Sequence, residues 1–137
     1  MIAFSDIVAA SRDAQLRQSE REQADRAFVE DVMATVAEQV QAEGGDLRQE
    51  GEWTRRSENA YALYRLDFPG GCNVQAATLA VGGAVGGRAG RSRPQFMVGD
   101  SGRSAEPVEV KDRAEATQQV MGYLMDLVRE TQRLHER

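Results

Sequence analysis

The chain has 137 residues, of which 41% are hydrophobic and 28% are charged, and its formal net charge is -5 at pH 7. This length suits one domain with a core of its own, and the mildly acidic balance disfavours general affinity for nucleic acid. One cysteine, Cys72, rules out an internal disulfide, and with a single histidine, His135, a conventional zinc site within one chain is not expected. No segment approaches the ~20 apolar residues of a membrane span, and no basic leader opens the chain. We therefore expect a cytoplasmic protein with no membrane partner, metal or cofactor.

A helix is expected first, from Ser5 to Glu43, because no proline or glycine interrupts the chain before Gly44 and Gly45. The second half of this helix repeats an apolar residue every four positions, which predicts a face packed on a sheet. That repeat consists of Phe28, Val32, Val36 and Val40.

The first half of this helix, Ser11 to Arg26, is almost entirely polar, and Leu16 is its one large apolar residue. A continuous helix would be roughly 58 Å long, whereas a compact domain of this length is only about 37 Å across. The helix therefore either breaks near Ser19 to Gln23, which is the simpler interpretation, or projects beyond the globule. We expect residues 1–26 to form a polar helical arm with an apolar N-terminus, and residues 27–137 to form a single α+β domain.

Two strands joined by a tight turn are predicted from Ala60 to Phe68 and from Cys72 to Val81. Pro69 and Gly70 suit a type II turn, because proline fixes φ and glycine accepts a positive φ. The second strand is rich in alanine, so a short helix from Gln75 to Val81 stays open as an alternative. The first strand alternates an apolar face with a mixed face. The apolar face carries Ala62, Tyr64, Leu66 and Phe68, and the mixed face carries Tyr61, Leu63, Arg65 and Asp67.

Three shorter extended segments and a last helix complete the expected fold. Strands are expected around Gly51 to Ser57 and from Gln95 to Val98, and Val108 to Val110 is a strand end or an extended lead-in. A helix should follow from Arg113 to Glu136, since its apolar residues recur with helical spacing. Its stripe consists of Val120, Leu124, Leu127, Val128 and Leu134, with Met121 and Met125 alongside.

The predicted fold class is therefore α+β. It combines one long or broken N-terminal helix, an antiparallel sheet of about four strands, and a C-terminal helix. Both helices should cover one face of the sheet, because only the face that carries Tyr64 and Leu66 is consistently apolar.

Signs of catalysis are weak, and we expect the chain not to be an enzyme. Gly82 and Gly87 have the spacing of the two glycines in a phosphate-binding loop, but Arg88 and Ala89 replace its lysine and its serine or threonine. His135 falls in the last turn of the final helix, which is a poor position for a general base. No catalytic residues are predicted.

A basic stretch after the second hairpin strand offers a nucleic-acid-binding alternative. Residues 82–107 hold four arginines and two acids, whereas residues 1–45 hold four arginines and nine acids. Glycine-arginine tracts contact phosphate backbones in some proteins, but here no aromatic residues are interleaved. The candidate contacts are Arg88, Arg91, Arg93 and Arg103.

The function that we expect is non-enzymatic protein binding, in the manner of a small acidic adaptor, chaperone or phage-type inhibitor that docks on a larger protein. An alternative is a self-assembling subunit whose N-terminal arm packs on another copy. Arginine and tryptophan are typical of binding hot spots, and exposed apolar residues are typical of interfaces. The candidate partner-binding residues are Ile2, Phe4, Ile7, Val8, Trp53, Arg55, Arg56 and Tyr61.

Overall fold

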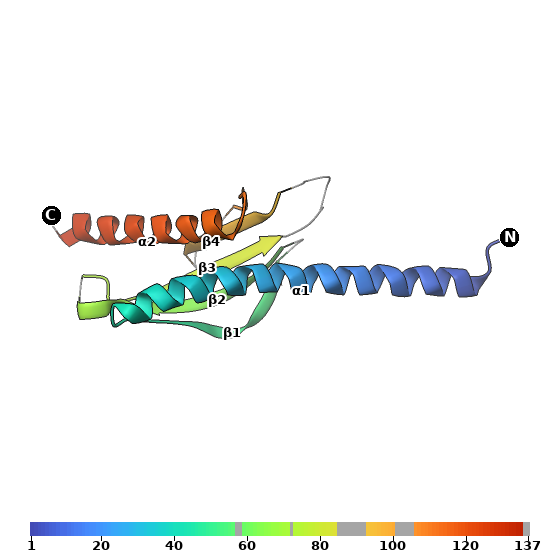
Figure 1. Cartoon of the computed structure of the whole chain (residues 1–137), viewed down its shortest axis with the longest axis horizontal. Coiled ribbons are helices and arrows are strands. Elements are labelled where there is room, and N and C mark those ends of the chain that lie inside the picture. The colour runs from blue at the N-terminus through green and yellow to red at the C-terminus, as the bar shows by residue number, and fades with distance from the viewer. Residues whose placement is uncertain (57–58, 72, 85–92, 101–105, 136–137) are drawn as a thin grey trace.

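The computed structural model describes residues 1–56, 59–71, 73–84, 93–100 and 106–135, and within them the chain forms two long helices and a five-stranded antiparallel sheet. Both helices pack against the sheet, so the predicted α+β fold class is confirmed (Figure 1). The elements in chain order are α1 (Phe4–Ala42), β1 (Asp46–Arg56), β2 (Asn59–Asp67), the 3-10 turn η1 (Pro69–Gly71), β3 (Ala76–Ala84), β4 (Gln95–Asp100), β5 (Val108–Glu109) and α2 (Arg113–His135).

The five strands follow one another across the sheet in chain order, from β1 at one edge to β5 at the other. The predicted hairpin is its centre, where Ala62 lies opposite Val81 and Tyr64 lies opposite Leu79. Gly70 adopts a φ of 73°, the positive value that the proline-glycine turn requires. The second hairpin strand begins at Ala76, four residues later than predicted, and the alternative helix over this segment is wrong.

Strand β1 is longer than expected, because it begins directly after the glycine stop of α1. It contains an irregularity between Glu50 and Thr54, where Gly51 has a φ of 76°. Across it β1 advances four residues while β2 advances only two, from Leu63 to Tyr61, and an irregularity of this kind bends and twists the strand. The prediction recovered only the part of β1 from Gly51 onward. Of the two options for Val108 to Val110 the strand is correct, as β5 (Val108–Glu109), so the sheet has five strands where about four were expected.

The core lies between the sheet and the two helices. From β2, Tyr64 and Leu66 point into it, and from α1, Val32 and Val36 are completely buried. The Arg113 guanidinium at the start of α2 lies 3.1 Å from an Asp31 carboxylate oxygen, which ties α2 to α1. The fully buried large side chains are Phe96, Leu66, Leu79, Val29, Val32, Val36, Val81, Val110 and Val120.

One alternative for the first helix is wrong, and so is part of the apolar stripe expected in α2. Helix α1 is continuous over 39 residues, so of the two alternatives for this helix the long projecting one is correct and the break near Ser19 to Gln23 does not occur. In α2, Met125 and Leu134 are 53% and 72% exposed. Met125 lies about 140° around the helix from Val120, away from the sheet, whereas Leu134 is on the apolar side but falls in the last turn of α2.

Burial of Tyr64 raises the pKa of its phenol to about 12, and the nearby negative charge of Glu30 adds to the effect. The unfolded chain should release this proton near pH 10. The contribution of Tyr64 to folding stability is therefore fully present below pH 10, and it is lost progressively as the pH rises toward 12. We expect Tyr64→Phe to flatten this loss in denaturant titrations across that range, and an unchanged pH dependence would contradict the assignment.

Candidate protein-docking surface

The first half of α1 extends beyond the sheet as a free helical arm (Figure 1). Asp25 is the first buried residue of α1, and only Val8 and Glu22 before it are even partly covered. The arm from Phe4 to Ala24 is therefore about 30 Å long. A helix of 39 residues is longer than the domain, and this projecting arm accounts for the excess length.

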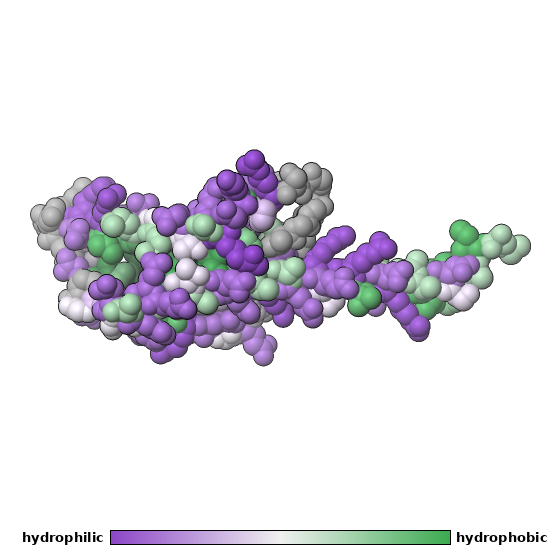
Figure 2. Space-filling view, viewed as in Figure 1, coloured by the Kyte–Doolittle hydropathy of each residue, from purple (hydrophilic) through white to green (hydrophobic). Residues whose placement is uncertain are grey.

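The end of the arm is apolar and exposed, as the green patch in Figure 2 shows. Phe4 is 77% exposed, Ile2 is 77% exposed and Ile7 is 55% exposed, while Val8 is partly buried. Large apolar side chains gathered at such exposure mark an interaction site more often than scattered single ones do. These four predicted partner-binding residues are thus brought together on one projecting element.

The stretch between this apolar end and the body is polar. Leu16 is its one large apolar residue and is 60% exposed. It lies about 180° around the helix from Ile7, as ideal helical geometry gives for nine residues. Leu16 is therefore outside the apolar face that Phe4 and Ile7 share.

The predicted contact residues on β1 belong to the body of the domain, where α1 meets the sheet, and not to the exposed end of the arm. Trp53 is partly buried against the core, and the Arg26 guanidinium carbon lies 5.8 Å from its ring centroid. Its indole N–H has no hydrogen-bond acceptor among the described residues. Arg55 and Arg56 pair through their backbones with Ala60 and Asn59. Trp53 therefore joins α1 to the sheet, and its position does not make it part of the exposed arm.

Tyr61 lies on the face of the sheet that the helices leave open. It is partly buried and pairs with Thr54 on one side and Gly82 on the other. The same face carries exposed ion pairs along its strands, with Arg48 beside Asp46 at 3.2 Å and Arg65 beside Asp67 at 3.4 Å. Exposed pairs of this kind contribute little to stability. The structure does not bring Tyr61 together with the residues of the arm.

The arginines of the nucleic-acid alternative lie mostly in segments that are not described. Arg88, Arg91 and Arg103 fall outside the described residues. Arg93 is exposed and lies 3.9 Å from a Glu109 carboxylate oxygen. This ion pair reduces the positive charge that Arg93 presents to a phosphate.

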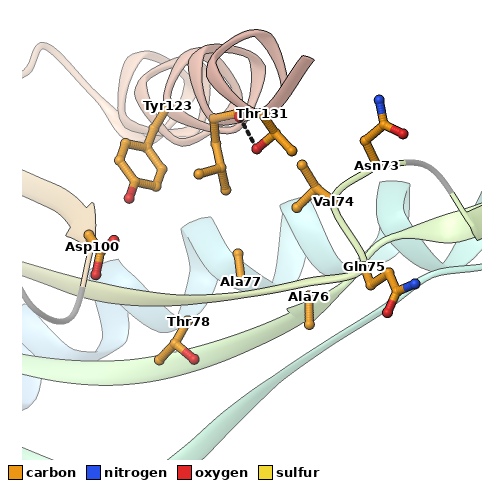
Figure 3. Close-up of a pocket in the computed structure, with 10 residues that line it drawn as sticks. Asn73, Val74, Gln75, Ala76, Ala77, Thr78, Asp100, Tyr123 and Thr131 are labelled. Carbon is orange, nitrogen blue, oxygen red and sulfur yellow. Dashed lines mark hydrogen bonds between the residues drawn. The ribbon is translucent and has the colours of Figure 1, made fainter. Parts of the chain in front are cut away.

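A cleft of about 610 Å³ opens between α2 and the beginning of β3 (Figure 3). Tyr123, Leu127 and Thr131 line it from α2, and Asp100 lies at the end of β4 on the other side. The Thr131 hydroxyl donates a hydrogen bond of 2.9 Å to the Leu127 carbonyl within the helix. Six of the ten lining residues are polar, namely Asn73, Gln75, Thr78, Asp100, Tyr123 and Thr131.

This cleft was hardly predictable from the amino-acid sequence. Its residues come from three distant segments, and only the spacing of Tyr123, Leu127 and Thr131, one helical turn apart, hinted at a shared face. Among the described residues, no group of three or more histidine, cysteine, aspartate or glutamate side chains could hold a metal ion. The cleft therefore offers hydrogen-bonding groups but no constellation that assigns it a reaction.

Neither of the two described helices is long and apolar enough to cross a membrane. No protein-family model matches the chain, and neither curated protein sequences nor solved structures yield a significant match. The geometry and chemistry of the exposed surfaces are thus the basis for any functional assignment.

Proposed function

We propose that the chain is a non-enzymatic protein-binding module in which α1 presents an apolar end to a larger partner protein. An adaptor, a chaperone or an inhibitor would use such an element. The observation that carries this proposal is the 30 Å arm with Phe4 and Ile7 exposed at its end. A protein gains nothing for its own core by holding these side chains in water.

The energetics favour a protein groove as the docking site. Burying one large apolar side chain contributes about 1.5–3 kcal/mol, so Phe4 and Ile7 together would contribute about 3–6 kcal/mol to the affinity of a helix-in-groove contact. Amphipathic helices dock in this manner through residues at helical spacing. The body then serves as a rigid base, because the fully buried Val32 and Val36 and the contact of Arg26 with Trp53 hold α1 against the sheet.

The test compares recovery of partner proteins from the native host by the unmodified chain and by two matched variants. Ile7→Glu should reduce recovery at least about tenfold, because it removes apolar contact and brings a charge into the groove. Leu16→Glu places the same charge on the opposite side of the arm and should leave recovery unchanged. A glutamate in the first turns of a helix is favourable, so loss of arm structure would not explain the result. Equal recovery by all three proteins would contradict the proposal.

A further inference from the structure

The apolar face of the arm is self-complementary in the size of its side chains. Phe4, Ile7, Ser11 and Ala14 follow one another at intervals of three, four and three residues, which is the spacing of a coiled-coil seam. All four are exposed. The two large residues lie at one end of the seam and the two small residues lie at the other end.

We propose that this face pairs with the same face of a second copy of the chain, with the two arms antiparallel. In this register Phe4 lies opposite Ala14 of the second copy, and Ile7 lies opposite Ser11 of the second copy. Each large side chain then fills the space over a small one, so the helices approach closely without a clash. The pairing rests on the proposed function, because it names the second copy as one partner of the docking face.

The length of the arm permits this pairing. Met1 would lie beside Arg17 of the second copy, and Asp25, where α1 enters the body, lies eight positions further along. Eight residues of helix span about 12 Å, so the end of one arm stops short of the other body. A shorter arm would bring the two bodies into collision before the seams overlapped.

Charge does not oppose the pairing. Residues 1–22 hold four acidic side chains and three arginines, so most of the net charge of -5 resides in the rest of the chain. The two acidic bodies would lie at opposite ends of the paired arms, beyond the ~10 Å over which charges interact at ordinary ionic strength. The polar cleft beneath α2 is a poor alternative site for the arm, since most of its lining residues could not cover a phenylalanine.

The association should be weak. Two seams of this length bury well under the ~1,200 Å² of a stable interface, so we expect a dissociation constant on the order of 0.1 mM. Sedimentation equilibrium of the full chain from about 10 µM to 1 mM should show a mass rising from 15.1 kDa toward that of a dimer. Ile7→Glu should remain monomeric, and Leu16→Glu should behave like the unmodified chain. A strict monomer at the highest concentration, or an association that Ile7→Glu leaves intact, would overturn the proposal.

Disulfide trapping tests the direction of the arms. Ile7→Cys and Ser11→Cys would each be made in a Cys72→Ser background and then mixed in a redox buffer. Antiparallel pairing predicts disulfides mainly between position 7 of one copy and position 11 of the other. Disulfides mainly between identical positions would indicate parallel arms and would overturn the proposal. If the unmodified chain is monomeric but Ile7→Glu still loses its partner protein, the pairing fails while the proposed function stands.

Discussion

Replacing Phe96 by alanine is expected to lower the free energy of unfolding by about 3–5 kcal/mol, because a large buried side chain is removed and a cavity remains. Phe96 is completely buried on β4, and its ring packs edge to face on Phe28 of α1 with centroids 6.3 Å apart. It lies beside Gly83 of β3, where an added Cβ would come within 3.2 Å of a Val29 methyl carbon. Phe96 therefore fills the space between α1 and the sheet, beside the close approach of Val29 to β3.

Urea unfolding of the purified protein would measure this loss, and Phe4→Ala provides a matched control. The same aromatic ring is removed at position 4, but from a side chain that is 77% exposed. Surface substitutions usually change stability by less than about 0.5 kcal/mol. Since small domains are stable by only about 5–15 kcal/mol, Phe96→Ala should shift the midpoint clearly. Similar midpoints for the two variants would contradict the position assigned to the core.

The parts of the fold that the sequence predicted are those that depend on a short repeat. The alternation from Ala62 to Phe68 defined β2, and the four-residue repeat from Phe28 to Val40 defined the packed part of α1. Period-two and period-3.6 patterns arise because one side of the element is buried. The buried side of such a strand or helix can therefore be predicted from its sequence. Where one side of an element is not buried against anything, the pattern carries no such information.

The continuity of α1 is the clearest case of this limit. The expected break near Ser19 to Gln23 depended on the assumption that the whole chain is compact, and no residue between Ser11 and Ala24 contradicts a helix. Alanine, glutamine, arginine and glutamate in this stretch all favour helix, and α1 is already nucleated on the body. The helix propensity of these residues therefore determined the conformation of the arm. The assumption that the whole chain is compact was wrong for this segment.

The candidate docking surface was predictable in part. The cluster of Ile2, Phe4, Ile7 and Val8 could be found because its members lie close together in the sequence. Trp53 could not be assigned, because its neighbours Glu52 and Thr54 to Arg56 are all polar and show no apolar alternation that would mark the buried face of β1. The cleft beside Tyr123 was missed, since it is formed only when segments far apart in the chain meet.

A proline placed in the arm should remove helix without destabilising the domain. Ser19→Pro would eliminate one backbone hydrogen bond and clash with the preceding turn. Residues 4–18 would then be a separate helix of about 15 residues, which is marginal in water. Because α1 and α2 together contain 62 helical residues, about a quarter of the helical circular dichroism signal should be lost. The melting temperature should stay within about 2 °C, because the arm makes no contribution to the core.

Ala34→Pro is the matched control for this experiment. Ala34 is a small, exposed residue of α1 like Ser19, but it lies between Met33 and Val36, which are both buried. A kink there would pull the apolar stripe of α1 off the sheet, so the whole domain should lose stability by ~3 kcal/mol or more. A Ser19→Pro protein that melts as early as Ala34→Pro would show that the first half of α1 packs on the body. The arm would then not be free to dock on any partner, and neither the groove contact nor the pairing of two arms could operate as proposed.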